Sequence, residues 1–135
     1  MNGRFQIAMH ILTLLNHKEG ELLSSEYIAG SVNANSALIR KELAILNKAG
    51  LVSSKSGKTG GYTIAQSAQS IRLADIYRAV NTQSVLGMAK NIPNPECPVG
   101  RQINSSINEL YEDIDKAVLT QLSAVTLADF VKNFH

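Results

Sequence analysis

The segment SGKTGG at positions 56–61 constrains the fold more than any other stretch, because three of its six residues are glycine. It separates two short segments, 51–55 and 62–65, in which apolar and polar residues alternate. Alternation of this kind is typical of half-buried β-strands, and glycine allows the backbone conformations of tight turns. The sequence therefore predicts a β-hairpin with a flexible basic tip that contains Lys58.

Two helices are expected at the start of the chain. Apolar residues recur at helical spacing between positions 5 and 15, which predicts the first helix. A short second helix around positions 27–29 can begin at Ser24 or Ser25, because a serine hydroxyl accepts a hydrogen bond from the unpaired amides of a first turn. Positions 30–34 are then expected to form a turn.

A third helix is expected before the hairpin, with Asn35 or Ser36 as its cap. Gly50 follows Ala49 and can supply the left-handed conformation that ends a helix. The apolar residues expected to face inward are Leu38, Ile39, Leu43, Ile45 and Leu46. The basic residues expected to stay at the surface are Arg40, Lys41 and Lys48.

Two further helical segments and a loop are expected after the hairpin. An apolar stripe predicts a fourth helix from about Ser70 to near Asn81. All three prolines lie within positions 85–100, so regular structure is not expected there. Thr126 and Asp129 have the spacing of a capping box, which predicts a short last helix.

This order of elements matches that of winged helix-turn-helix proteins, which place one helix in the major groove of DNA and a hairpin wing on its backbone. The expected fold is mainly α with a small β-hairpin: a winged helix-turn-helix followed by a long dimerisation helix. We expect a DNA-binding domain at 1–82, a cysteine-containing loop at 83–101, and the dimerisation and C-terminal helices at 102–135. The same module also serves as a protein–protein interface, and the order of elements leaves that alternative open.

Charge is distributed unevenly along the chain. The net charge is only +2, but six basic residues and a single acidic residue, Glu42, lie between positions 40 and 72. Acidic residues without a base occupy positions 109–115. This polarity predicts a basic DNA-binding face and an acidic far side. The candidate DNA contacts on the third helix and the hairpin are Asn35, Ser36, Arg40, Lys41, Lys55, Lys58 and Thr59. Helix capping and solvation are the plainer roles for these residues.

The residues from position 24 to position 80 resemble the first domain of the Rrf2 family of bacterial transcription regulators. The resemblance continues through the loop to TLADFV at 126–131, so it covers nearly the whole chain. It implies a homodimeric repressor whose long C-terminal helices cross and whose third helix and wing contact double-stranded DNA. It also implies a DNA contact at Ser25, before the second helix. The motifs that carry it are Ile28-Ala29, Lys41-x-Leu43, Ala49-Gly50-Leu51-Val52, Gly57-x-x-Gly60-Gly61-Tyr62 and Leu73-x-Asp75-Ile76.

Between positions 103 and 117, apolar residues alternate spacings of four and three, and Gln121 continues the spacing, as in helices that pack lengthwise on another helix. A pseudo-palindromic operator usually requires a two-fold dimer, so we expect the partner helix to come from a second copy. Packing on the chain's own domain is the alternative. The residues assigned to dimerisation are Ile103, Ile107, Leu110, Ile114, Ala117 and Val118.

The single cysteine, Cys97, excludes an intrachain disulfide. Rrf2 members with an iron–sulfur cluster have three cysteines in the corresponding loop, and Cys97 matches the last of them. We therefore expect no iron–sulfur cluster, other cofactor or metal site. Cys97 remains a candidate redox sensor that would form a sulfenic acid, a mixed disulfide with a small thiol, or a bridge to a second protomer. An inert cysteine, with control by an unknown small-molecule effector, is the alternative.

Enzymatic and membrane functions find no support. The histidines, at 10, 17 and 135, are scattered, and GKTGGY lacks the spacing of a phosphate-binding loop. No apolar run approaches the ~20 residues that span a bilayer. We therefore expect a cytoplasmic protein that is not an enzyme.

Overall fold

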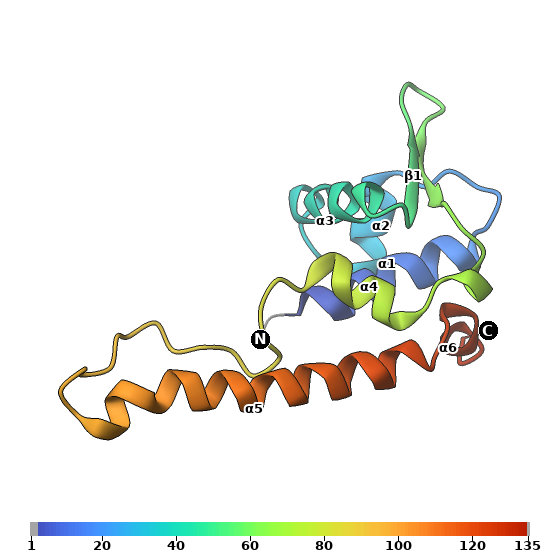
Figure 1. The fold of residues 1–135 in the computed structure, drawn as a ribbon. Coiled ribbons are helices and arrows are strands. Elements are labelled where there is room, and N and C mark those ends of the chain that lie inside the picture. Colours follow the sequence, from blue (N-terminus) through green and yellow to red (C-terminus); the bar gives the residue numbers. More distant parts are fainter. Residues whose placement is uncertain (1–2, 135) are drawn as a thin grey trace.

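The computed structural model describes residues 3–134. The expected class, mainly helical with one two-stranded antiparallel hairpin, is confirmed (Figure 1). The elements are α1 (Arg4–His17), α2 (Ser25–Val32), α3 (Ser36–Lys48), β1 (Val52–Lys55), β2 (Gly61–Ile64), the 3-10 helix η1 (Ala68–Ser70), α4 (Leu73–Val80), α5 (Pro98–Ser123) and α6 (Leu127–Val131). We call residues 3–80 together with α6 the head; α5 runs along one side of the head and extends beyond it.

Local capping chemistry sets the ends of α2 and α3. The Ser24 hydroxyl accepts a hydrogen bond from the Tyr27 amide at 3.0 Å, and the Asn35 side-chain oxygen accepts from the Ala37 amide at 2.7 Å. Helix α2 runs through Val32, so the turn is shorter than the expected 30–34. Asn33 caps the helix with a left-handed φ of 60°, a conformation that asparagine tolerates better than most residues.

The hairpin pairs Val52 with Ile64 and Lys55 with Gly61. The segment before α2 joins the hairpin by an isolated antiparallel β-bridge, in which Leu23 and Tyr62 exchange backbone hydrogen bonds of 2.8 and 2.9 Å. A Cβ atom on Gly61 would lie 2.8 Å from the Leu23 carbonyl oxygen. This glycine is therefore needed where the two chain segments approach each other.

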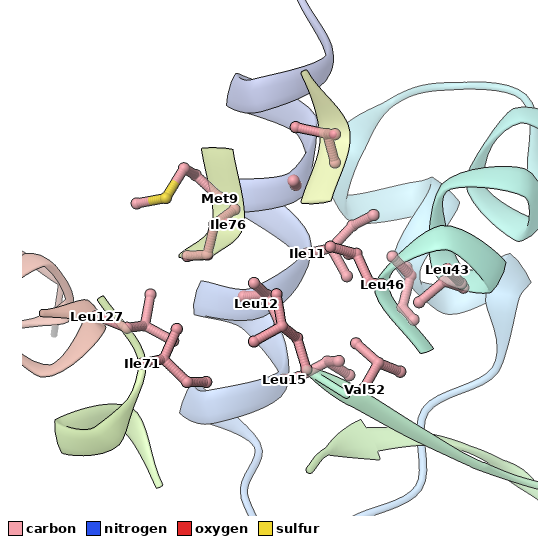
Figure 2. Close-up of a cluster of buried hydrophobic side chains, with 14 of the residues drawn as sticks. Met9, Ile11, Leu12, Leu15, Leu43, Leu46, Val52, Ile71, Ile76 and Leu127 are labelled. Carbon is pink, nitrogen blue, oxygen red and sulfur yellow. The ribbon is translucent and has the colours of Figure 1, made fainter. Parts of the chain in front are cut away.

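The core of the head surrounds α1, whose Ile11, Leu12 and Leu15 are almost fully buried (Figure 2). These side chains meet residues from α3, β1, α4 and α6. One expected core position is wrong: Leu38 is 40% exposed. The buried face of α3 instead repeats at Ile39, Leu43 and Leu46, with Glu42 also inward, which is the spacing of one helical face.

Helix α4 starts later than expected, at Leu73, because residues 68–70 form a 3-10 turn. Helix α5 starts earlier, at Pro98, inside the range expected to be loop. Proline is tolerated in a first helical turn because the amide that it lacks would have no partner there.

The end of α5 and helix α6 pack against residues 68–76 of the head. The Arg72 guanidinium donates to the Ser123 carbonyl at the end of α5 at 2.8 Å, and Leu127 is fully buried in the core. The predicted capping box of α6 is confirmed: Thr126 and Asp129 exchange two side-chain-to-backbone hydrogen bonds of 3.1 Å. Hydrogen bonding of the Asp129 carboxyl by Thr126, chiefly by its backbone amide, lowers the pKa of that carboxyl.

Candidate DNA-binding surface and long-helix face

Helix α3 presents its polar side away from α1. Asn35, Arg40 and Lys41 are exposed, and Ser36 is half-buried. Arg40 Nη1 lies 3.7 Å from Glu26 Oε1 of α2, an acid that the sequence did not single out. Both side chains are largely exposed, so this ion pair contributes little to stability and leaves Arg40 available to a competing anion.

Ser25 does not occupy the expected place. It is the first residue of α2 rather than a residue before it, and only 7% of it is exposed. Its hydroxyl donates to Glu26 Oε2 at 3.3 Å. The exposed hydroxyl at this helix end belongs to Ser24, which already accepts the capping hydrogen bond. Ser25 is therefore not part of the surface.

The hairpin tip stands away from the head on the same side as α3, opposite α5 (Figure 1). Lys55, Lys58 and Thr59 are all exposed there. Gly57 has a φ of 101°, a conformation that other residues rarely adopt, so this glycine shapes the tip.

A cleft of about 340 Å³ separates α3 from the hairpin. Asn47 Nδ2 of α3 donates to Ser54 Oγ of β1 at 3.1 Å and holds the wing against the helix. Arg40 and Lys48 also line this cleft. Asn47 and Ser54 were missed in the sequence because spacing alone does not show which faces of a helix and a hairpin meet.

Five of the six basic residues between positions 40 and 72 are exposed on α3 and the hairpin: Arg40, Lys41, Lys48, Lys55 and Lys58. The sixth, Arg72, lies outside this surface, because its guanidinium donates to the Ser123 carbonyl at the C-terminus of α5. The single acid of the stretch, Glu42, is 2% exposed and paired with Arg4. The exposed charge of α3 and the wing is therefore almost purely positive.

Helix α5 contains no fully buried residue although it is 26 residues long. Ile103 is 39% and Leu110 52% exposed, Ala117 is exposed, and Ile107 and Ile114 are half-buried. Val118 differs because it lines a cavity against its own head. At 3.6 residues per turn, the face with Ile103 and Leu110 lies roughly a quarter turn from the face that contacts the head.

Cys97 is exposed immediately before α5, at its N-cap position. Within residues 3–134, no three histidine, cysteine, aspartate or glutamate side chains are grouped as metal ligands would be. No helix of this described part is both long and apolar enough to cross a membrane.

Comparisons with known proteins agree with this architecture. The Rrf2 family model, described as an iron-dependent transcriptional regulator, matches residues 1–133. YwnA of Bacillus subtilis, named as an HTH-type transcriptional regulator, is 35% identical over 133 residues, 98% of each chain. A crystal structure described as a DNA-binding protein has a TM-score of 0.75 at 32% identity and covers 94% of this chain and 97% of its own. A crystal structure described as a transcriptional regulator from Lactobacillus plantarum has a TM-score of 0.79 at 25% identity. The match covers 96% of this chain and 88% of that one.

The cysteine content of this chain does not fit an iron–sulfur cluster, although the family model is described as an iron-dependent regulator. A protein-bound iron–sulfur cluster needs several thiolates that converge on the iron, and the sequence contains one cysteine. One cysteine therefore does not supply the ligand set of such a cluster.

Proposed function

Because this chain belongs to the Rrf2 family of transcriptional regulators, we propose that it is a homodimeric repressor that binds a pseudo-palindromic operator in double-stranded DNA. The proposal rests above all on the gathering of five exposed cations on α3 and the hairpin, on the side of the head away from α5. A bacterial operator lies in the cytoplasm, so this function requires a cytoplasmic protein. The homologues are transcriptional regulators, and we assign no enzymatic activity.

The proposed DNA contacts divide into two groups. Asn35 and Ser36 at the N-terminus of α3 bring short hydrogen-bonding groups to base edges or phosphates, and Arg40 and Lys41 follow one turn later. Lys55, Lys58 and Thr59 bring the wing to the DNA backbone. A surface of this charge favours DNA over an apolar protein partner.

The proposed dimer joins two α5 helices through Ile103, Ile107, Leu110, Ile114 and Ala117. Support comes from the exposure of Ile103, Leu110 and Ala117 on a helix that contains no fully buried residue. Ile107 and Ile114 of the same stripe are partly exposed. A two-fold axis between the helices would present the two heads to the two halves of an operator.

Two kinds of effector fit a repressor of this form. Exposure of Cys97 supports control by oxidation or by a mixed disulfide with a small thiol. The alternative is an inert Cys97 and control by a bound small molecule. In either case the effector would change how α5 orients the two heads.

The first test is binding of the purified protein to DNA from its own promoter, compared with a scrambled fragment of equal length. We expect selective binding that weakens steeply between about 50 and 200 mM salt, because each phosphate contact releases counterions. Equal binding to both fragments, or affinity unaffected by salt, would contradict the proposal.

The same assay separates the two effectors. Loss of binding on reversible oxidation in wild type, with no loss in Cys97→Ser, would assign control to the thiol. Indifference of both proteins to oxidation would assign control to a ligand.

A further inference from the structure

A cavity of about 450 Å³ lies where the head meets α5 within a single chain. Phe5 of α1 and Val80 of α4 wall it on the head side. Val118 and Leu122 of α5 wall it on the opposite side. Val85 contributes from residues 81–97, which link α4 to α5 and which we call the connecting segment. Its volume falls within the ~300–1,000 Å³ of typical ligand sites, and these walls are apolar.

The polar residues that line the cavity all belong to α4 and the segment that follows it. Asn81 Nδ2 donates to the Tyr77 hydroxyl at 2.8 Å, and Thr82, Gln83 and Ser84 are the other polar lining residues. Burial and the nearby Asp115 carboxylate raise the pKa of Tyr77, so its hydroxyl stays neutral at physiological pH. Among residues 3–134, none of those that line the cavity carries a formal charge.

The nearest acid also ties the connecting segment to the long helix. Asp115 Oδ1 of α5 accepts from the Ser84 hydroxyl at 3.0 Å and from the Val85 amide at 3.1 Å. On the head side, Phe5 and Tyr77 pack edge to face with ring centroids 5.8 Å apart. A molecule in this cavity would therefore touch the head, the connecting segment and α5 at once.

We propose that this cavity is the effector site, and that it takes an uncharged small molecule with a ring-sized apolar body and a hydrogen-bonding group. No described residue that lines the cavity is a cation, and the Asp115 carboxylate lies beside Ser84, so both observations disfavour anions. A compact cation would lose its hydration against the apolar walls, and Asp115, which already accepts hydrogen bonds from Ser84 and Val85, does not line the cavity. The proposal rests on the proposed function only in the effect of the ligand on DNA.

The site can be tested with three probes that all contain an indole ring. Indole is uncharged, tryptamine is a cation, and indole-3-acetate is an anion. We expect indole at ten times its dissociation constant to raise the melting temperature by about 4 °C. NMR shifts should centre on Phe5, Tyr77 and Val118. Equal or tighter binding of either charged probe would overturn the assignment to uncharged ligands.

Two variants that fill the cavity identify the site. Val118→Phe fills it from α5, and Val85→Phe fills it from the connecting segment, where the backbone adjusts more easily. Either folded variant should lose at least tenfold in indole affinity, whereas Val99→Phe, exposed in the first turn of α5, should not. Unchanged indole binding in the filled variants would overturn the proposal.

A DNA-binding measurement separates this proposal from the proposed function. If the protein binds its promoter, saturating indole should change that affinity at least threefold in wild type and leave the filled variants unaffected. Indole binding without any effect on promoter affinity would refute the effector role. Failure of the protein to bind DNA would count against the proposed function, while the melting and NMR results would still decide whether the cavity binds ligand.

Discussion

Arg4 at the start of α1 donates from Nε to Glu42 Oε1 of α3 at 3.1 Å. Glu42 is 2% exposed and Arg4 28%. Lys41, the neighbour of Glu42, is exposed on the outer side of the same helix. The ion pair therefore joins the inner face of α3 to α1, and helps to set where α3 presents its outer face.

Removal of Arg4 alone should destabilise the head. Arg4→Met leaves the Glu42 carboxylate buried without its cation, which costs about 3 kcal/mol of unfolding free energy. Urea denaturation measures this loss. The double variant Arg4→Met/Glu42→Met removes both charges and should recover most of it. A double variant no more stable than Arg4→Met would contradict this account.

Removal of a DNA-facing cation should lower the salt dependence of promoter binding. Lys41→Ala and Lys58→Ala should each reduce the slope of log affinity against log salt by about 0.9 for every phosphate that the protein no longer neutralises. Fluorescence anisotropy over a salt series measures the slope. Lys90→Ala, in the connecting segment, is the control. The same change of slope in this variant would show that the salt dependence reflects the net charge of the protein and not contacts of Lys41 and Lys58 with phosphates.

Neutralisation of Glu26 should strengthen DNA binding. Glu26 competes with phosphate for Arg40 and places a negative charge near the proposed DNA-binding surface. Glu26→Gln should therefore raise promoter affinity about threefold, while stability changes by less than about 0.5 kcal/mol because the pair is exposed. An affinity equal to or below that of wild type would show that Arg40 does not contact DNA.

Acid should weaken the attachment of α6. The folded-state pKa of Asp129 is lowered by the Thr126 hydrogen bonds, so its stabilising effect is present above the unfolded pKa of 3.8 and is lost as pH falls through the folded value. Wild type should be more stable than Asp129→Asn at pH 7, and the difference should shrink below about pH 4. Thermal unfolding over pH 2–7 measures it, and a difference independent of pH would contradict the assignment.

The elements were predictable from sequence because each has a local cause. Three glycines in SGKTGG indicated the hairpin, and Thr126 with Asp129 indicated the last helix. The exposed cations of α3 followed from helical spacing. These signals depend on residues close together in the chain, where local sterics and hydrogen bonding decide the outcome.

Contacts between distant segments were not predictable in the same way. Periodicity placed Leu38 inside and did not reveal that Glu42 is buried, because burial of Glu42 depends on Arg4, 38 residues earlier. The charge count included Arg72 in the basic stretch that predicted a DNA-binding face. Its guanidinium instead donates a hydrogen bond to the Ser123 carbonyl, 51 residues later. The apolar pattern of α5 likewise did not separate the face of Leu110 from that of Val118, since only packing on the head distinguishes them.

The exposed face of α5 yields the sharpest prediction about assembly. Leu110→Glu places a charge at a residue that is 52% exposed in the single chain and would be central to the proposed dimer. The head should stay folded, because α5 faces it through Val118 and Leu122 instead. Sedimentation velocity should show a dimer for wild type and a monomer for Leu110→Glu. Operator affinity should fall by about a hundredfold as the two linked heads become independent.

Ser105→Glu adds the same charge away from the apolar face, and should leave a dimer that binds DNA normally. Monomeric wild type, or dissociation of both variants alike, would show that this face is not the dimer interface.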